Sequence, residues 1–384
     1  MIIQQHLWVA SEGWNPGLLK DNPRDAQMVL VFGSPHLLRN RRLIEEIKVT
    51  YPAATLFGSS TAGEIFGTRV FDDTLTATAI HWEHTRLRFV SEMIKNAEDS
   101  ITAGRRLAEH LDHKHLLRHV FVLSEGLQVN GSELVRGLTG GLPSQVSITG
   151  GLAGDGDRFG ETHILWNDQG ESNRVAAVGF YGDRLQVGYG SFGGWDPFGP
   201  ERLVTRSRGN ILYEMDGKSA LHLYKRYLGD QAEDLPASGL LFPLSLRTEN
   251  SDRPLVRTLL AVSEDDQSMT FAGDIPEGSY ARLMKANFDR LIDGAAEAAK
   301  TSLDILGSFK PELIILISCV GRKLILKQRI EEEIEGVRDV LGNDACYTGF
   351  YSYGEISPSA REARCELHNQ TMTITAFAEG SSHA

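Results

Sequence analysis

The sequence contains few cysteines, and they form no recognisable pattern. Three occur among 384 residues, at Cys319, Cys346 and Cys365, and no two of them make a Cys-x-x-Cys motif. An odd number at these spacings excludes a disulfide framework, which is the usual support of a small secreted domain. We therefore expect a cytoplasmic protein with reduced thiols.

Long apolar runs and an excess of positive charge are also absent. The strongest apolar run, 313–320, is far shorter than the roughly 18 residues of a membrane helix. The first residues, MIIQQHLWVASEGW, lack the basic and apolar regions of a signal peptide. A formal net charge of -12 provides no net basic footprint for a nucleic acid or an anionic membrane. We expect neither as a partner.

Signatures of common enzymes and metal sites are missing as well. The chain has no Gly-x-Ser-x-Gly elbow, no P-loop and no His-Glu-x-x-His helix. His115 and His119 have the i, i+4 spacing of metal ligands, but no other ligand motif lies near them, so a solvated surface explains them better. We expect no catalytic residue and no metal site.

Enough apolar material for a large core is present. Hydrophobic residues make up 41% of the chain and charged residues 23%, an ordinary balance for a globular protein. At about 100–200 residues per domain, this length favours two domains. We place them at 1–210 and 211–384.

One pattern occurs three times: an apolar strand, a segment with helical spacing, and a second strand that runs into a glycine-rich turn. The first strands of the three copies are MVLVFGS, HVFVLSEG and LIILISCVG. After the first of them, Leu43, Ile44 and Ile47 have the spacing of one helix face. This alternation of strands and helices predicts an α/β fold with mixed sheets.

The first and third copies are the most alike. Aligning Ser34 with Ser318 places GSSTAGEIFG on GFYSYGEISP, with Gly63 and Glu64 matching Gly354 and Glu355. We interpret this as an internal duplication that gives two related halves. Short strands and glycine turns around 175–217 predict an antiparallel meander between the halves.

Two further segments carry specific expectations. Residues 74–82 alternate between polar and apolar and predict a half-exposed strand. Residues 279–307 have helical spacing and predict a helix, with a kink or break at Gly294.

Glu64 and Glu355 follow strand ends, where ligands commonly bind in α/β proteins. Flanking glycines allow close backbone approach. Each carboxylate could hold a ligand, or it could accept backbone N–H bonds that stabilise the turn. Asp155 and Asp157, in the glycine-rich turn of the second copy, leave the same two alternatives open.

Six motifs in order resemble the FIST family, whose members pair an N-terminal and a C-terminal FIST domain. They span almost the whole chain and read FGSSTAGEIFG, VLSEGLQVNGSELVRGL, SITGGLAGDGDRF, VGFYGDRLQVGYGSFGGW, SALHLYKRYLGD and GFYSYGEISP.

The resemblance implies a non-enzymatic sensor in signal transduction that binds a small ligand and signals to a separate protein such as a histidine kinase. The ligand would be an amino-acid-like metabolite or, as in FIST proteins of the NosP type, a haem that responds to nitric oxide. His222 is then a candidate axial ligand. A homodimer is left open.

The motif positions carried over as ligand-binding residues come from all three copies of the pattern. They are Gly63, Glu64, Asn130, Gly131, Gly151, Asp155, Asp157, Gly354 and Glu355. The rival from another class is a hydrolase or transferase that uses Glu64 or Asp155 as its acid or base.

Overall fold

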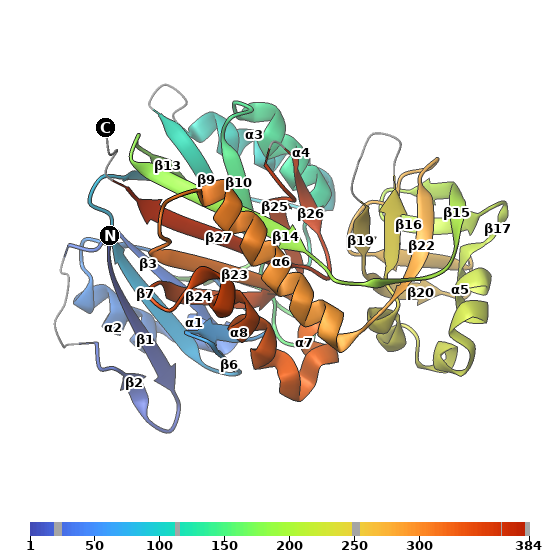
Figure 1. The fold of residues 1–384 in the computed structure, drawn as a ribbon, viewed down its shortest axis with the longest axis horizontal. Coiled ribbons are helices and arrows are strands. Elements are labelled where there is room, and N and C mark those ends of the chain that lie inside the picture. The colour runs from blue at the N-terminus through green and yellow to red at the C-terminus, as the bar shows by residue number, and fades with distance from the viewer. Residues whose placement is uncertain (19–24, 112–115, 248–253, 362, 381–384) are drawn as a thin grey trace.

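The computed structural model describes residues 1–18, 25–111, 116–247, 254–361 and 363–380. Two parts are visible in Figure 1, a large body that holds both termini and a smaller β-domain at its side. The β-domain extends from Asp196 to Lys285, so the domain boundary predicted at 210/211 falls inside it. The chain crosses between the two parts twice, just before Asp196 and just after Lys285.

Three copies of one strand pattern build the body, and we call them units 1, 2 and 3. In each unit two parallel strands are joined by a helical crossover, as parallel pairing requires. A return strand lies antiparallel beside the first strand, and a lead strand pairs with the return strand. Unit 3 is interrupted by the β-domain between its lead strand and its first parallel strand.

The lead, first, second and return strands of the units are as follows. Unit 1 has β1 (Ile2–Val9), β3 (Met28–Gly33), β4 (Thr55–Ser60) and β7 (Leu75–His81). Unit 2 has β8 (Arg86–Met93), β9 (Leu117–Ser124), β10 (Ser147–Leu152) and β13 (Arg174–Tyr181). Unit 3 has β14 (Leu185–Phe192), β23 (Leu313–Cys319), β24 (Cys346–Ser352) and β27 (Met372–Glu379).

A hairpin between the second and return strands of each unit is donated to the sheet of another unit. Unit 1 donates β5 (Glu64–Phe66) and β6 (Arg69–Phe71) to unit 3, next to β24. Unit 2 donates β11 (Ile164–Trp166) and β12 (Gln169–Glu171) to unit 1, next to β4. Unit 3 donates β25 (Gly354–Pro358) and β26 (Cys365–His368) to unit 2, next to β10. The exchange therefore closes a ring of three sheets, and β2 (Gly13–Asn15) extends the first of them.

The structure confirms the predicted strand–helix–strand units on mixed sheets. It also confirms that the first and third copies are related. The second copy, HVFVLSEG onward, belongs to the same series as a full unit. Gly58, Gly150 and Gly349 occupy the same place in the three second strands. A Cβ at any of them would lie within 2 Å of a carbonyl oxygen of the neighbouring first strand, at 1.8, 1.8 and 1.9 Å respectively.

The buried apolar side chains of the body lie on both faces of the three sheets. One buried cluster fills the space that the sheets enclose and includes Phe32, Phe57, Phe121, Phe350 and Phe377. A second lies beneath the helices of units 2 and 3, and a third beneath those of unit 1. Because each sheet is covered on both faces, 74–82 is almost fully buried, and its predicted half exposure is wrong.

Helices cover the outer faces of the sheets. Unit 1 has α1 (Pro35–Leu38) and α2 (Arg41–Thr50), and unit 2 has η1 (Ala97–Asp99), α3 (Ser100–His110) and α4 (Gly131–Gly141). Unit 3 has α6 (Phe288–Leu306), α7 (Val320–Leu326), η4 (Lys327–Arg329) and α8 (Ile330–Leu341). Among the described residues no helix is long and apolar enough to cross a membrane.

The β-domain is an antiparallel sheet around its own core. Its strand order is β19-β18-β22-β15-β16-β21-β20, with β17 beside β16, and the helical segments α5, η2 and η3 complete the domain. The bounds are β15 (Asp196–Arg208), β16 (Ile211–Met215), β17 (Lys218–Ser219), α5 (Ala220–Leu228), η2 (Gly229–Asp234), η3 (Ala237–Leu241), β18 (Leu244–Arg247), β19 (Leu255–Arg257), β20 (Leu259–Ser263), β21 (Ser268–Phe271) and β22 (Tyr280–Lys285).

The predicted helix over 279–307 is partly wrong. Its first part forms β22, which pairs with β15 and β18, and α6 begins only at Phe288. Gly294 lies within an uninterrupted α6, so the expected break is wrong too. A Cβ at Gly294 would lie 3.0 Å from the Gly193 carbonyl oxygen, so the glycine lets α6 pack closely against the segment that leads into the β-domain.

Candidate functional site between the body and the β-domain

The turn that contains Glu64 is buried and held by hydrogen bonds. The Thr74 backbone N–H and hydroxyl donate to Glu64 Oε2 at 3.1 and 2.7 Å, and the Thr61 hydroxyl donates to Oε1. Glu64 is 1% exposed, and burial raises its pKa to about 7. This carboxyl group therefore links the end of β4 to the start of β7.

Glu355 repeats this arrangement in unit 3. The Thr371 backbone N–H and hydroxyl donate to Oε2 at 3.2 and 3.0 Å, and the Ser352 hydroxyl donates to Oε1 at 2.6 Å. Burial raises the pKa of Glu355 to about 8. The two GEI turns are thus equivalent in bonding as well as in sequence, and the contacts favour the structural alternative for both carboxyl groups.

Asp155 has a corresponding role in unit 2, where it shapes the loop that follows. Its Oδ2 accepts the Gly160 and Glu161 N–H groups, both at 2.9 Å, and its Oδ1 accepts the phenol of Tyr353. Asp157 is exposed on the same loop. Asp155 therefore fixes the orientation of the Tyr353 ring.

The predicted glycines serve close packing between units. A Cβ at Gly151 would lie 2.8 Å from Ile317, and one at Gly131 would lie 2.8 Å from Leu367. A Cβ at Gly354 would lie 2.9 Å from Leu152, and one at Gly63 would lie 2.5 Å from the Lys323 ammonium.

The histidines that the sequence singles out differ in their burial. His222 is exposed near the start of α5. His119 is buried in β9, where its ring nitrogens bond the hydroxyls of Ser147 and Thr149 at 2.8 and 3.0 Å, so the predicted solvated surface is wrong for this residue. His115 lies outside the described residues. Among those that are described, no group of three His, Cys, Asp or Glu side chains could hold a metal ion.

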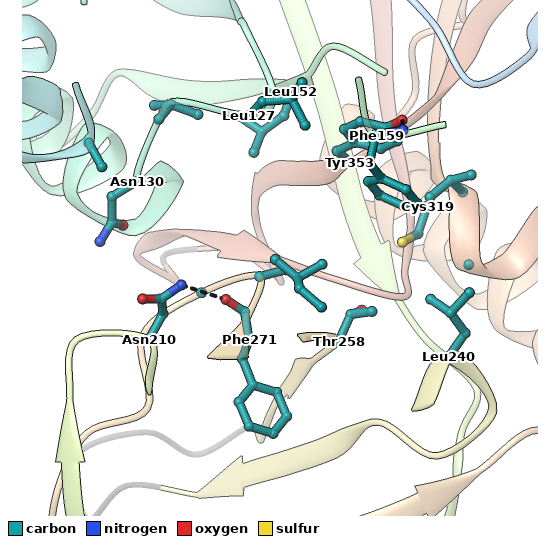
Figure 2. A pocket seen from close by; sticks show the side chains of 18 residues that line it. Leu127, Asn130, Leu152, Phe159, Asn210, Leu240, Thr258, Phe271, Cys319 and Tyr353 are labelled. Carbon is teal, nitrogen blue, oxygen red and sulfur yellow. Dashed lines mark hydrogen bonds between the residues drawn. The ribbon is translucent and has the colours of Figure 1, made fainter. Parts of the chain in front are cut away.

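A cavity of about 230 Å³ lies where the body meets the β-domain, and Figure 2 shows it from close by. On the body side its lining includes Leu127, Asn130, Leu152, Phe159, Cys319 and Tyr353. On the β-domain side it includes Asn210, Leu240, Thr258, Leu260 and Phe271. Of the predicted ligand residues, Asn130 lines this cavity, whereas Glu64, Asp155 and Glu355 do not.

Asn130 joins the two parts beside the cavity. Its Oδ1 accepts the Glu133 N–H at 3.1 Å and so caps α4, while its Nδ2 donates to Asp274 of the β-domain at 3.1 Å. Asn is a preferred residue for such a cap. The motif VLSEGLQVNGSELVRGL thus contributes four residues to the cavity lining: Gly126, Leu127, Val129 and Asn130.

Two polar side chains of the β-domain keep hydrogen-bonding capacity that the described contacts do not use. The Thr258 hydroxyl is buried and makes no hydrogen bond within the described structure. Asn210 donates from Nδ2 to the Phe271 carbonyl at 2.8 Å, which leaves its Oδ1 as an available acceptor. No motif in the sequence distinguishes either residue.

A second cavity, of about 300 Å³, also lies between the two parts and has a charged lining. It includes Arg136, Arg257, Asp274, Arg364 and Glu366. The Arg257 guanidinium is buried and donates to the carbonyls of Asp274, Val256 and Leu367 at 3.2, 3.2 and 3.0 Å. Burial lowers its pKa to about 10. Arg257 thereby ties the β-domain to β26 of the body.

Arg322 in α7 holds both crossings of the chain. It is fully buried and donates to the carbonyls of Gly193 and Leu291 at 2.5 and 2.7 Å, and to Glu333 at 2.7 and 3.0 Å. Gly193 lies just before β15 and Leu291 in the first turn of α6. We call 193–196 and 285–291 the hinge segments. The two residues before Arg322 line the uncharged cavity, so one short helix contacts both the cavity and the hinge.

Comparison with known families decides where the chain belongs. The FIST N domain matches residues 27–218, and the FIST C domain matches residues 220–358. The chain belongs to the FIST family. FIST domains are sensory domains of signal transduction, and the predicted family is confirmed. The β-domain thus lies mostly within the FIST C part of the chain, and both parts contribute residues to the cavity beside it.

Relatives of this FIST protein are distant. The uncharacterized protein MJ1623 of Methanocaldococcus jannaschii is 25% identical over 240 residues, which is 55% of this chain and 45% of that protein. The chain therefore matches about half the length of that relative. The uncharacterized protein Rv0628c of Mycobacterium tuberculosis is 22% identical over 368 residues, 92% of this chain and 91% of that protein.

Solved structures give weaker likenesses. A cyanuric acid hydrolase from A. caulinodans aligns with 99% of both chains at 8% identity and a TM-score of 0.38. A second cyanuric acid hydrolase structure aligns at 9% identity and a TM-score of 0.33. Neither likeness is close enough to carry an argument about activity.

Proposed function

We propose that this FIST protein is a non-enzymatic, cytoplasmic sensor whose small ligand binds in the uncharged cavity between the body and the β-domain. The observation that carries the proposal is the composition of this cavity, because both parts of the chain contribute to its wall. A ligand there contacts both parts at once. It therefore favours one relative position of the β-domain over others, as a sensor requires.

The hinge supports a route from ligand to signal. Val320 and Gly321 line the cavity, and Arg322, the next residue, holds both hinge segments by their carbonyls. A ligand that displaces the start of α7 moves this guanidinium and loosens or tightens the hinge. A separate protein, such as a histidine kinase, then reads the position of the β-domain.

The residues of this cavity do not fit a haem. An axial ligand would have to be a His, Cys or Tyr. None of the His residues that the structure describes lines the cavity, and His222 is exposed on α5. Burial raises the pKa of the Cys319 thiol far above its usual range, which disfavours the thiolate, and the Tyr353 phenol donates to Asp155. We therefore do not propose haem for this site.

The contacts also support binding over hydrolysis. The two candidate acids, Glu64 and Asp155, are occupied by hydrogen bonds within their own turns and do not line the cavity. No carboxylate lines the cavity among the described residues. A nucleophile and base that meet in one pocket, the arrangement a hydrolase needs, are absent from its lining.

Filling the cavity tests the proposal. A library of small metabolites is screened by thermal shift against the wild type, Ala272→Trp and Ala261→Trp. Ala272 lines the cavity, whereas Ala261 is exposed on β20 and serves as the matched control. We expect at least one metabolite to raise the Tm of the wild type and of Ala261→Trp but not of Ala272→Trp. Equal shifts in all three proteins, or none in any, would contradict the proposal.

A further inference from the structure

The cavity offers a ligand no opposite charge. No charged side chain lines it in the ranges that the structure describes, in contrast to the five charged residues of the second cavity. Moving an ionised group from water into a mostly apolar cavity is unfavourable unless a counter-charge compensates it. The absence of charged residues from the described lining therefore selects against ionised ligands in this cavity.

Hydrogen-bonding capacity is nevertheless present at two places on the β-domain side. The Thr258 hydroxyl is 5% exposed and has no partner, so it can both donate to and accept from a ligand. The orientation of the Asn210 amide is fixed, because its Nδ2 must meet the Phe271 carbonyl. Its Oδ1 is therefore an acceptor, which an N–H or O–H group of a ligand can match.

The remaining wall is apolar and partly aromatic. The rings of Phe159 and Tyr353 stack at 4.4 Å with an interplanar angle of 16°, and Leu127, Leu152 and Leu240 line the space around them (Figure 2). A dry cavity of about 150 Å³ is known to hold a benzene ring. At 230 Å³ this cavity has room for a ring that bears a small polar substituent.

We infer that the cavity selects an uncharged, mostly apolar small molecule that carries at least one N–H or O–H donor, such as a primary amide on an aromatic ring. The inference rests on the proposed function and specifies its ligand class. It separates this ligand from a free amino acid, because an amino acid carries two charges at neutral pH. Thr258 and Asn210 are the specificity-determining residues.

Two probes of nearly equal shape test the inference. Indole-3-acetamide and indole-3-acetate differ at one position, where the first has a neutral amide and the second a carboxylate. Their Kd values are measured by calorimetry for the wild type, Thr258→Val and Thr270→Val. Thr270 lies on the neighbouring β21 outside the cavity and is the matched control.

We expect the amide to bind the wild type at least about tenfold more tightly than the carboxylate, since each 1.4 kcal/mol is a factor of ten. Thr258→Val should weaken binding of the amide about three- to tenfold, and Thr270→Val should leave it unchanged. The folded state of each variant is checked by its Tm.

Other results separate this inference from the proposed function. Equal or tighter binding of the carboxylate, abolished by Ala272→Trp, would overturn the ligand class and uphold the cavity as a sensor site. Failure of both probes to bind the wild type would also overturn the ligand class. The metabolite screen against Ala272→Trp then decides the sensor function by itself.

Discussion

At Glu64 and Glu355 both carboxyl oxygens accept hydrogen bonds, whereas in the interdomain cavity the buried Thr258 hydroxyl has no partner within the described structure. Both regions bury polar atoms beside glycine-rich segments. In the turns the bonds connect strands of one unit. In the cavity the free hydroxyl belongs to a lining that two parts of the chain share.

This difference separates residues that hold the fold from residues available to a ligand. A buried polar group without a hydrogen bond costs free energy, and such groups are few in native proteins. Where one lines a cavity, a ligand can supply the missing partner. The carboxyl groups that stand out in the sequence have all their hydrogen bonds within the fold. The atoms that we propose for binding belong to Thr258 and Asn210, which no motif marks.

The largest effect is expected at Arg322, which holds both hinge segments next to the cavity. Arg322→Met leaves Glu333 as a buried charge without its partner. We expect the free energy of unfolding to fall by about 4 kcal/mol, measured by chemical denaturation. The double variant Arg322→Met/Glu333→Leu removes the unpaired charge and should recover part of the loss. If the double variant recovers no stability, the hydrogen bonds to the hinge carbonyls, and not the ion pair, account for most of the loss.

Removing a turn carboxyl should cost stability and leave binding intact. Glu355→Ala leaves the Ser352 hydroxyl and both Thr371 donors unpaired, so we expect a loss of about 3 kcal/mol in the free energy of unfolding. Asp157→Ala, on the exposed loop, is the control and should change little. A drop in ligand affinity with unchanged stability would restore the ligand interpretation of the turn.

The turns should also make stability depend on pH. The pKa of Glu355 is raised from 4.5 to about 8 by burial, so the folded protein retains a proton that the unfolded chain releases. This contribution is complete below about pH 4.5 and is lost as the pH rises toward 8. Relative to Glu355→Gln, wild-type stability should fall by roughly 3–4 kcal/mol between pH 5 and 8.

The comparison with Glu355→Gln cancels other titrating groups. Burial lowers the pKa of His119 to about 3 and that of His368 to about 4, which destabilises the wild type and the variant alike in acid. A parallel pH dependence of the two proteins would mean that Glu355 is ionised in the fold throughout this range.

The smallest effects are expected for the substitution of Thr by Val. It should lower the free energy of unfolding at the turn and raise it at the cavity. Thr371→Val removes a hydroxyl that donates to Glu355 at 3.0 Å and should cost about 1 kcal/mol. Thr258→Val removes a buried hydroxyl without a partner and should raise stability by up to about 1 kcal/mol. Thermal denaturation of both variants measures the difference. Equal losses would mean that the Thr258 hydroxyl is satisfied.

Much of the fold could be predicted from local pattern. The apolar strands, the crossover helices and the repeated Gly-Glu-Ile turns identify the first and third units, because each signal lies within a few residues. The exchange of hairpins could not be predicted, since pairing between β5 and β24 joins residues nearly 300 positions apart. The strand β22 was missed because burial beside β15 overrides the helical spacing of its residues.

The candidate site was harder to predict. The motif around Asn130 identifies that residue, whereas Tyr353, which precedes the predicted Gly354 and Glu355, carries no signal of its own. Thr258 and Asn210 carry no local signal, because their proposed role arises only when the β-domain meets the body and both residues line the cavity between them. Which residues line this cavity depends on the tertiary structure and cannot be predicted from the spacing of residues in the sequence.

A ligand in the uncharged cavity should change the position of the β-domain relative to the body. Fluorophores attached through unnatural amino acids at Glu109 of α3 and Asp265 of the β20–β21 turn, both exposed, report the distance between the two parts by energy transfer. With indole-3-acetamide we predict a shift to a new distance in the wild type and none in Ala272→Trp. An unchanged distance in a wild-type protein saturated with this probe would contradict the claim.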